Sequence, residues 1–259
     1  MKTGSIENYV ADTDMEKGLR EIITIKGKGT IPPKDFNEIV KRLCFALSFF
    51  GEYGREALRK KEFSILFGRS EYNLLKGKFS GNGNVITIRN VLQNIKLTIG
   101  LSPSSFGKGS IEDLFVHEFA HFIDHQKGKN TFISSVPSSK ERQIAEAFFA
   151  KMSKKEIQLN SCYVARTCEL FARAIEEYWG ILNGTDDAYI RVHSDNYYEE
   201  KSKIGVCVFD KTWEEYANYR SDCSLGGFYV ERDVFLENIA PLVADYMKCI
   251  QEGSMSPVS

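Results

Sequence analysis

Three of the four histidines of this chain lie close together, in the stretch LFVHEFAHFIDH at residues 114–125. His117 and His121 are four positions apart, so on a helix their rings project from nearly the same side and can meet one tetrahedral metal ion. Glu118 is offset by about 100° around the helix, where its carboxylate would face a water molecule rather than the ion. This H-E-x-x-H arrangement predicts metal-assisted hydrolysis, in which Glu118 activates the metal-bound water by taking its proton.

Two histidines need a third protein ligand, and a fourth position must stay open for water and substrate. Position 127 is a lysine, which excludes the metzincin pattern with its third histidine ten residues after the first. His125 lies two turns from His117, too far along the axis for both rings to share one ion, and we expect it to be solvated or to neighbour the site. For Asp124 we favour a role in orienting a ligand or the helix over direct ligation.

A glutamate on another expected helix is the better third ligand. Glu169 stands alone among apolar neighbours in CELFARAIEEYW, and an isolated carboxylate on a packed helix needs a partner. An internal ion pair with Arg173, one turn further on, is the alternative role of Glu169. Glu146 is the second candidate for the ligand, whereas Glu176 and Glu177 are expected on an exposed face.

The motif must be carried by a helix, and its flanking residues predict one. Ser110 followed by Asp113 is a capping-box pattern and Gly128 is a stop signal, so a helix of about four turns is expected between them. Apolar residues on several of its sides predict that it is largely buried. Further helices are expected at 138–154, at 163–182 and at 231–250, the last with an interruption near Pro241.

The first hundred residues predict two helices and a few short strands. Residues 1–33 are interpreted as an extended lead-in that adds at most one strand, at 21–25. A helical pattern follows Asp35, a candidate cap, and Gly51 and Gly54 are expected to divide it into two helices. Strands are also expected in a hairpin at 76–90, at 94–100 and at 204–209.

Composition narrows the class of protein. The chain has 259 residues, and its 42% apolar content is enough for a packed core. The 34 basic and 35 acidic residues nearly cancel, so the overall charge gives no attraction to nucleic acid or anionic lipid. No signal-peptide pattern and no apolar run of membrane-spanning length are visible, so we expect a cytoplasmic protein, with delivery by a specialised secretion system left open. The six cysteines are widely spaced and are expected to be reduced.

The stretches HEFAHFIDH and CELFARAIEEY together resemble a known family. They are similar to the gluzincin-like metallopeptidase domain called the large polyvalent protein-associated domain, which occurs in proteins of phages, plasmids and conjugative elements. The matching positions are His117, Glu118, His121 and Asp124 in the first block and residues 169–174 in the second. The resemblance extends from about Val85 to Leu182. It implies Glu169 as the third metal ligand and Arg173 as a residue that orients the helix or the ligand.

The expected fold is α+β and zincin-like, mostly helical with a small mixed or antiparallel sheet beside the HExxH helix. Residues 1–70 would form an N-terminal extension and helical region of unknown role, and residues 71–259 the metallopeptidase domain, unless both belong to one continuous domain. The expected function is that of a zinc metalloendopeptidase, a hydrolase that cleaves a protein or peptide substrate laid against the strand at 85–89. The metal site comprises His117, His121 and Glu169.

An oxyanion stabiliser is also required, and Tyr163, His193 and Tyr229 are the candidates. Two other functions stay open at this point. One is a non-catalytic or DNA-associated accessory protein of a mobile element, for which the basic runs at 26–28 and 59–61 are the only support. The other is a protease effector delivered into another cell. A membrane partner is not expected.

Overall fold

The computed structural model describes residues 9–10, 12–26, 33–68, 87–89, 96–101, 111–128, 132–151, 167–183, 230 and 232–253. Its helices are α1 (Thr13–Ile22), α2 (Pro33–Ser48), α3 (Gly51–Arg59), α4 (Ile111–Lys127), α5 (Lys140–Lys151), α6 (Thr167–Asn183), α9 (Arg232–Asn238) and α10 (Ala240–Gln251), with the short 3-10 helix η4 (Ile133–Ser135). Its strands are β1 (Ile23–Lys26), β2 (Phe63–Gly68), β3 (Thr87–Arg89) and β4 (Lys96–Leu101).

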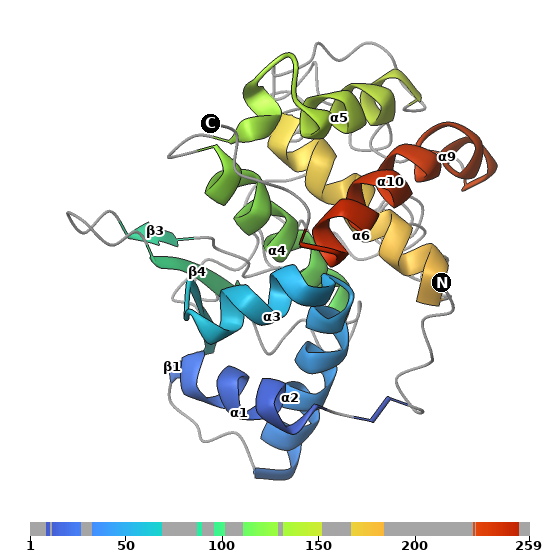
Figure 1. Ribbon diagram of the computed structural model, residues 1–259. Coiled ribbons are helices and arrows are strands. Elements are labelled where there is room, and N and C mark those ends of the chain that lie inside the picture. Colours follow the sequence, from blue (N-terminus) through green and yellow to red (C-terminus); the bar gives the residue numbers. More distant parts are fainter. Residues whose placement is uncertain are drawn as a thin grey trace, which may run out of the picture.

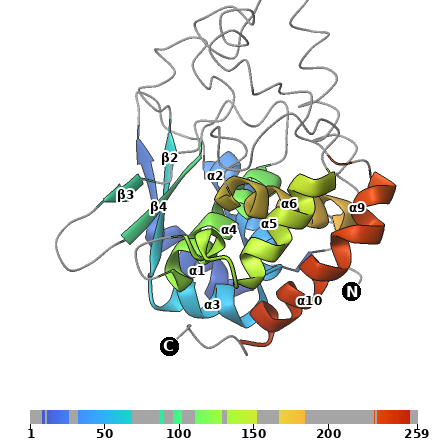
Figure 2. The same cartoon turned by 90° about the horizontal axis from the view of Figure 1, so that it is seen from above.

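The four strands form one mixed sheet in the order β1-β2-β4-β3. β2 runs parallel to both β1 and β4, with Ile65 opposite Ile23 on one side and Ile99 on the other. β3 runs antiparallel to β4 and forms one edge of the sheet. The helices lie on one side of the sheet (Figure 2). The mostly helical architecture with a small sheet confirms the predicted α+β class.

Helix α4 lies between the sheet and α6, and its two sides have different chemistry (Figure 1). The fully buried Phe119 contacts Phe50, with ring centroids 4.5 Å apart, and Phe63 of β2, with centroids 5.2 Å apart. His117 precedes Phe119 by two positions, about 200° around the helix. The phenylalanines therefore anchor one side of α4 in the core, and the histidines face the other way, towards α6.

Helix α6 is held between α2 and α10 by aromatic side chains. Trp179 meets Phe45 of α2 and Phe49, which follows the end of α2, edge to face, each with ring centroids 5.1 Å apart. Phe171 meets Tyr246 of α10 in the same way at 5.3 Å. These buried contacts fix the orientation of α6, and with it the side chains that α6 presents to α4.

Several sequence predictions are confirmed. Helices α4, α5 and α6 form where they were expected, the second helical stretch is divided at Gly51, and the closing helix is interrupted just before Pro241. Strands β1 and β4 match two of the expected strands. Among the described cysteines, Cys44, Cys168 and Cys249 are free, as predicted.

Other predictions were wrong. The lead-in contains α1, which begins after Asp12, whose side chain accepts hydrogen bonds from the backbone of Asp14 and Met15. α2 begins at Pro33, so Asp35 lies in its first turn and does not precede it. β2 had not been expected, whereas β3 lies within the second strand of the predicted hairpin. The turn of the predicted hairpin and the predicted strand at 204–209 lie outside the described residues.

None of the helices in the described part of the chain combines the length and the apolar character that a membrane span requires.

Candidate metal centre

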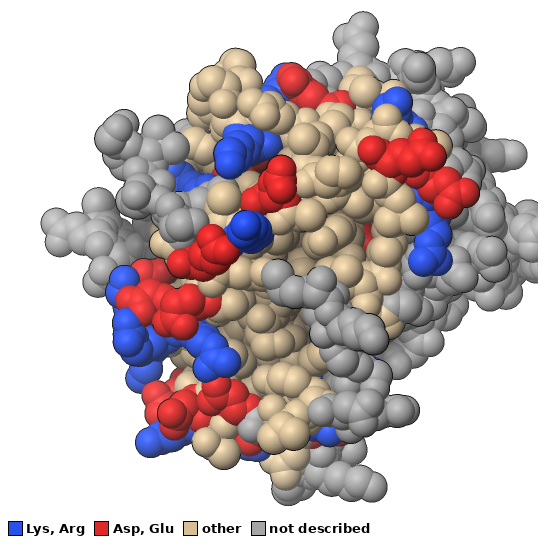
Figure 3. Space-filling model, turned by 45° about the vertical axis from the view of Figure 1, so that its right-hand side comes forward, with Lys and Arg blue, Asp and Glu red and all other residues tan. Residues whose placement is uncertain are grey.

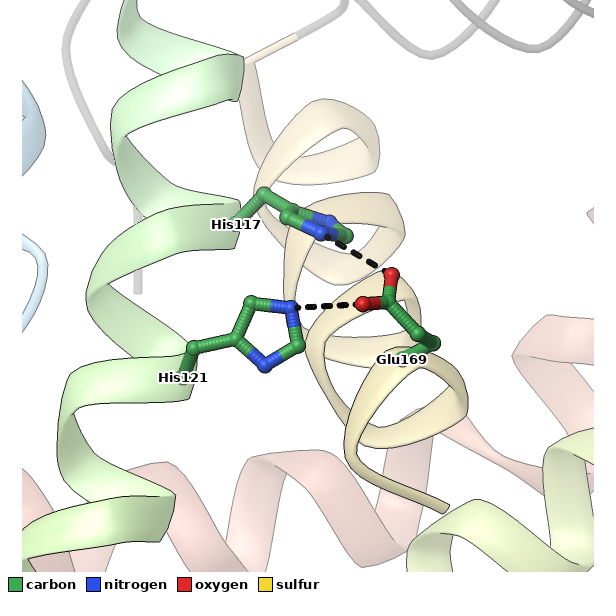
Figure 4. Close-up of side chains that lie close together, drawn as sticks. All are labelled: His117, His121 and Glu169. Carbon is green, nitrogen blue, oxygen red and sulfur yellow. Dashed lines mark ion pairs between the residues drawn. The ribbon is translucent and has the colours of Figure 1, made fainter. Parts of the chain in front are cut away.

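The imidazoles of His117 and His121 on α4 point at the carboxylate of Glu169 on α6 (Figure 4). Nε2 of His117 lies 3.6 Å from one carboxylate oxygen, and Nε2 of His121 lies 3.5 Å from the other. One ligand atom from each of the three residues lies within 4.8 Å of the others. Within the described ranges, this is the only group of three or more histidine, cysteine, aspartate or glutamate side chains with that proximity.

The chemistry and spacing of this donor set fit a zinc ion. Two imidazole nitrogens and one carboxylate oxygen form a ligand set that catalytic zinc sites use. Two ligand atoms that are each about 2.0–2.1 Å from a tetrahedral ion lie roughly 3.3–3.4 Å apart. The two nitrogen–oxygen separations of 3.5 and 3.6 Å are close to that value and longer than a normal hydrogen bond.

The site gathers more negative charge than its histidines can balance. Three buried carboxylates, those of Glu118, Glu169 and Glu176, interact electrostatically with the two imidazoles. Even if both rings were protonated, these three carboxylates would outnumber them by one negative charge. Buried negative charge is costly, so a divalent cation is a suitable partner for this cluster.

The pKa shifts follow from this crowding. Burial raises the pKa of the Glu118 carboxyl above its ordinary value. Burial alone would also raise the pKa of Glu169, but the imidazoles of His121 and His117 hold it well below its usual range. Burial alone would lower the pKa of His117, but Glu176 and Glu169 outweigh it and raise this pKa to about 10.

Glu176 was missed by sequence reasoning. The expectation of an exposed face was wrong, because Glu176 and Glu177 are both buried. Oε2 of Glu176 lies 2.9 Å from Nδ1 of His117, within hydrogen-bond distance. Glu176 follows Glu169 by seven positions, which places both on one face of α6, and this spacing was the signal available in the sequence.

Asp124 and His125 lie beside the ligand group and are not part of it. Asp124 is fully buried, and its Oδ1 accepts a hydrogen bond from the backbone N–H of Ser134 at 2.7 Å. His125 is buried, and its ring meets that of Phe132, which also meets His121. The hydrogen bond from Ser134 to Asp124 therefore holds η4 against α4. Phe132, which precedes η4, packs against the rings of His121 and His125.

The remaining candidates have different positions. Glu146 is half-exposed and forms an ion pair with Arg142 at 2.7 Å, so it does not join the ligand group. Arg173 is half-buried on α6, one turn after Glu169. The candidate oxyanion stabilisers Tyr163, His193 and Tyr229 lie outside the described residues.

No protein-family model matches the chain, and no curated protein matches it.

Proposed function

We propose that this chain is a zinc-dependent metallopeptidase with a zincin-like fold, related to the large polyvalent protein-associated domain whose motifs it resembles. The observation that carries the proposal is the convergence of His117 and His121 with Glu169 from a separate helix. Glu118, the general base of the motif, is buried next to them. A chance H-E-x-x-H match has no reason to meet a third ligand at this distance.

The three ligand residues would hold the ion, and a bound zinc ion would supply Lewis acidity, which polarises a carbonyl group and acidifies water. Glu118 would accept a proton at its carboxylate and return it to the amide nitrogen that leaves when the peptide bond breaks. Phe132 and the buried side of α4 would limit the access of bulk water to this proton transfer.

The sheet supports a peptide as the substrate. β3 is an edge strand, and it has no partner on its outer side among the strands that the structure describes. An extended peptide can add to such an edge through main-chain hydrogen bonds. β4, the neighbour of β3, packs against α4, so a peptide bound along the outer edge of β3 would extend the sheet from the side on which it contacts the metal helix, two strands out from β4.

A DNA-associated accessory function is less well supported. The basic run at 59–61 is largely offset by two carboxylates, because Arg59 and Lys60 pair with Glu56 and Lys61 pairs with Glu21. Acidic and basic side chains are interspersed on the face in Figure 3, without the single-sign stripe that nucleic-acid binding favours. Of the run at 26–28, only Lys26 lies within the described residues.

The proposal can be tested with Glu118→Gln, which keeps the shape of the side chain and removes the base. Bound zinc is measured by mass spectrometry of the metal, and cleavage by mass spectrometry of a random-sequence peptide library. We expect one zinc ion per chain in both proteins and a loss of cleavage by roughly 10²- to 10⁴-fold in the variant. Glu146→Gln, which changes a carboxylate outside the ligand group, should retain both properties.

Two results would contradict the proposal. A wild-type chain that binds no zinc removes the metal site. Cleavage that is equally fast in Glu118→Gln comes from another source. Zinc in both proteins with cleavage in neither would favour the non-catalytic accessory protein.

A further inference from the structure

The ring of His117 is held between two carboxylates that come from the same helix. Its Nε2 lies 3.6 Å from Oε2 of Glu169, and its Nδ1 lies 2.9 Å from Oε2 of Glu176. Seven residues along a helix correspond to nearly two turns, a rise of about 10.5 Å, with both side chains on one face. α6 therefore presents one carboxylate to each nitrogen of the same imidazole.

The short contact on the Nδ1 side determines which nitrogen is free for a metal. An ionised carboxylate can only accept a hydrogen bond, so Nδ1 of His117 must carry the proton that is shared with Glu176. The lone pair of a neutral imidazole then lies on Nε2, the nitrogen that faces Glu169. The contact with Glu176 selects the tautomer that a metal at this site requires.

The two histidines are held unequally. Nδ1 of His121 is buried without a hydrogen-bond partner among the residues that the structure describes, whereas Nδ1 of His117 has an anionic partner. Within the same residues, the second carboxylate oxygen of Glu176, Oε1, is also buried without a partner. A buried carboxylate with one hydrogen bond is a costly choice for packing alone, so its position calls for another explanation.

We propose that Glu176 is a positioning residue of the metal site, which fixes the orientation and tautomer of His117 and thereby strengthens the hold of the site on zinc. This inference rests on the metal-binding part of the proposed function. A carboxylate behind a metal-binding imidazole makes the ring a better donor, and losing such a partner typically weakens metal affinity by roughly 10- to 100-fold. Glu176 would not itself be a ligand, because it contacts Nδ1 of His117, the ring nitrogen on the far side from Glu169.

The experiment compares full-length wild type with Glu176→Gln and, as matched control, Glu177→Gln. Both substitutions neutralise a buried carboxylate on α6, and only the first removes the charge next to His117. Zinc affinity is measured by competition with a chromophoric chelator near pH 7.5. We expect Glu176→Gln to bind zinc roughly 10- to 100-fold more weakly, and Glu177→Gln to stay within about threefold of wild type.

Thermal unfolding of the metal-free proteins shows whether each variant still folds. Glu176→Gln loses the anionic partner of the His117 ring, so we expect a modest fall in its metal-free Tm, and a loss of zinc affinity that Glu177→Gln does not share distinguishes a positioning role. Glu176→Asp keeps the charge on a shorter side chain, and its zinc affinity should lie between those of wild type and Glu176→Gln.

Three results would overturn the inference. One is zinc affinity in Glu176→Gln within about threefold of wild type, and another is an equal weakening in Glu177→Gln. The third is a loss of metal-free stability in Glu176→Gln without a change in zinc affinity. None of these three results contradicts the proposed function. A wild-type chain that does not bind zinc would contradict both the proposed function and the role of Glu176.

Discussion

Asp124 is a buried acid whose burial costs stability as the pH rises. Its Oδ1 accepts the N–H of Ser134. Burial raises the pKa of this carboxyl from 3.8 to about 6, because the hydrogen bonds from Ser134 and the charge of His121 offset only part of that effect. The folded protein thus binds the proton more tightly than the unfolded chain. The stabilising contribution is fully present below about pH 4 and is lost as the pH rises through about 6.

Asp124→Asn should remove this pH dependence, because an asparagine can still accept the Ser134 N–H and carries no charge. In the metal-free protein, the fall in the free energy of unfolding between about pH 4 and 6 should become shallower. At pH 7 the variant should be more stable than wild type by roughly 1–3 kcal/mol. Urea unfolding with a chelator present measures both effects. An unchanged slope would mean that Asp124 does not hold its proton in the folded state.

At the scale of elements, the start of α3 depends on one glycine. Gly51 has a φ of +55°, and a Cβ at this position would lie 2.7 Å from the Cα of Gln251 at the end of α10. The side chain of Gln251 donates a hydrogen bond to the carbonyl of Phe49 at 2.7 Å, which ties the same two elements together. The backbone of α3 and that of α10 approach so closely that no other residue fits.

Gly51→Ala should therefore destabilise the fold in two ways. The left-handed backbone costs an alanine roughly 1–2 kcal/mol, and displacing α10 adds a packing loss of similar size. Gly253→Ala is the control, because Gly253 has a φ of +64° but nothing lies within 4 Å of its Cβ position. Denaturant unfolding should show a clearly larger loss at Gly51. Equal losses of unfolding free energy in Gly51→Ala and Gly253→Ala would indicate that the close contact with α10 does not contribute to the destabilisation.

The elements that were predicted correctly carry strong local signals. α4 and α6 are long, apolar and periodic, and Gly51 separates α2 from α3 because its conformation is one that other residues avoid. α1 was missed although Asp12 caps it, because its buried residues are few in a polar segment. β2 was missed because FSILFG is a short apolar run close after a helix, and such a run cannot be told from a helical segment by periodicity alone.

The candidate site was predicted in the same uneven way. His117, His121 and Glu118 share one motif, and Glu169 was isolated among apolar residues, so each was visible in the sequence. Glu176 was not, because two adjacent glutamates are typical of a solvated helix face. Its burial depends on the packing of α4 against α6, and the contacting residues His117 and Glu176 lie 59 positions apart. The seven-residue spacing from Glu169 places Glu176 on the face of α6 that carries the ligand, but it does not identify His117 as its partner.

At the scale of the whole molecule, the site joins the two halves of the core. Its ligands come from α4, which packs on β4 of the sheet and on α2, and from α6, which packs on α5 and α10. The buried residues from Met15 to Ile250 form one connected hydrophobic cluster around these two helices. A metal ion held between α4 and α6 would therefore act as a cross-link between helices that organise most of the described fold, and its removal should be felt globally.

Zinc should accordingly stabilise the whole chain by mass action. At a free zinc concentration of about 100 times Kd, binding adds about 2.7 kcal/mol to the free energy of unfolding. For a chain of this size, that corresponds to a rise in Tm of roughly 5–10 °C over the chelator-treated protein. Calorimetry with zinc or with a chelator measures the difference.

The zinc-dependent rise in Tm should be lost in Glu169→Gln, because the amide does not replace an anionic ligand. Gly51→Ala, which lies outside the ligand group, should lower Tm in both conditions and keep the full difference between them. A full zinc-dependent rise in Glu169→Gln would mean that the ion binds elsewhere. If Gly51→Ala also lost the zinc-dependent rise in Tm, that rise would depend on the overall stability of the fold and not on a specific site, because Gly51 is not a ligand.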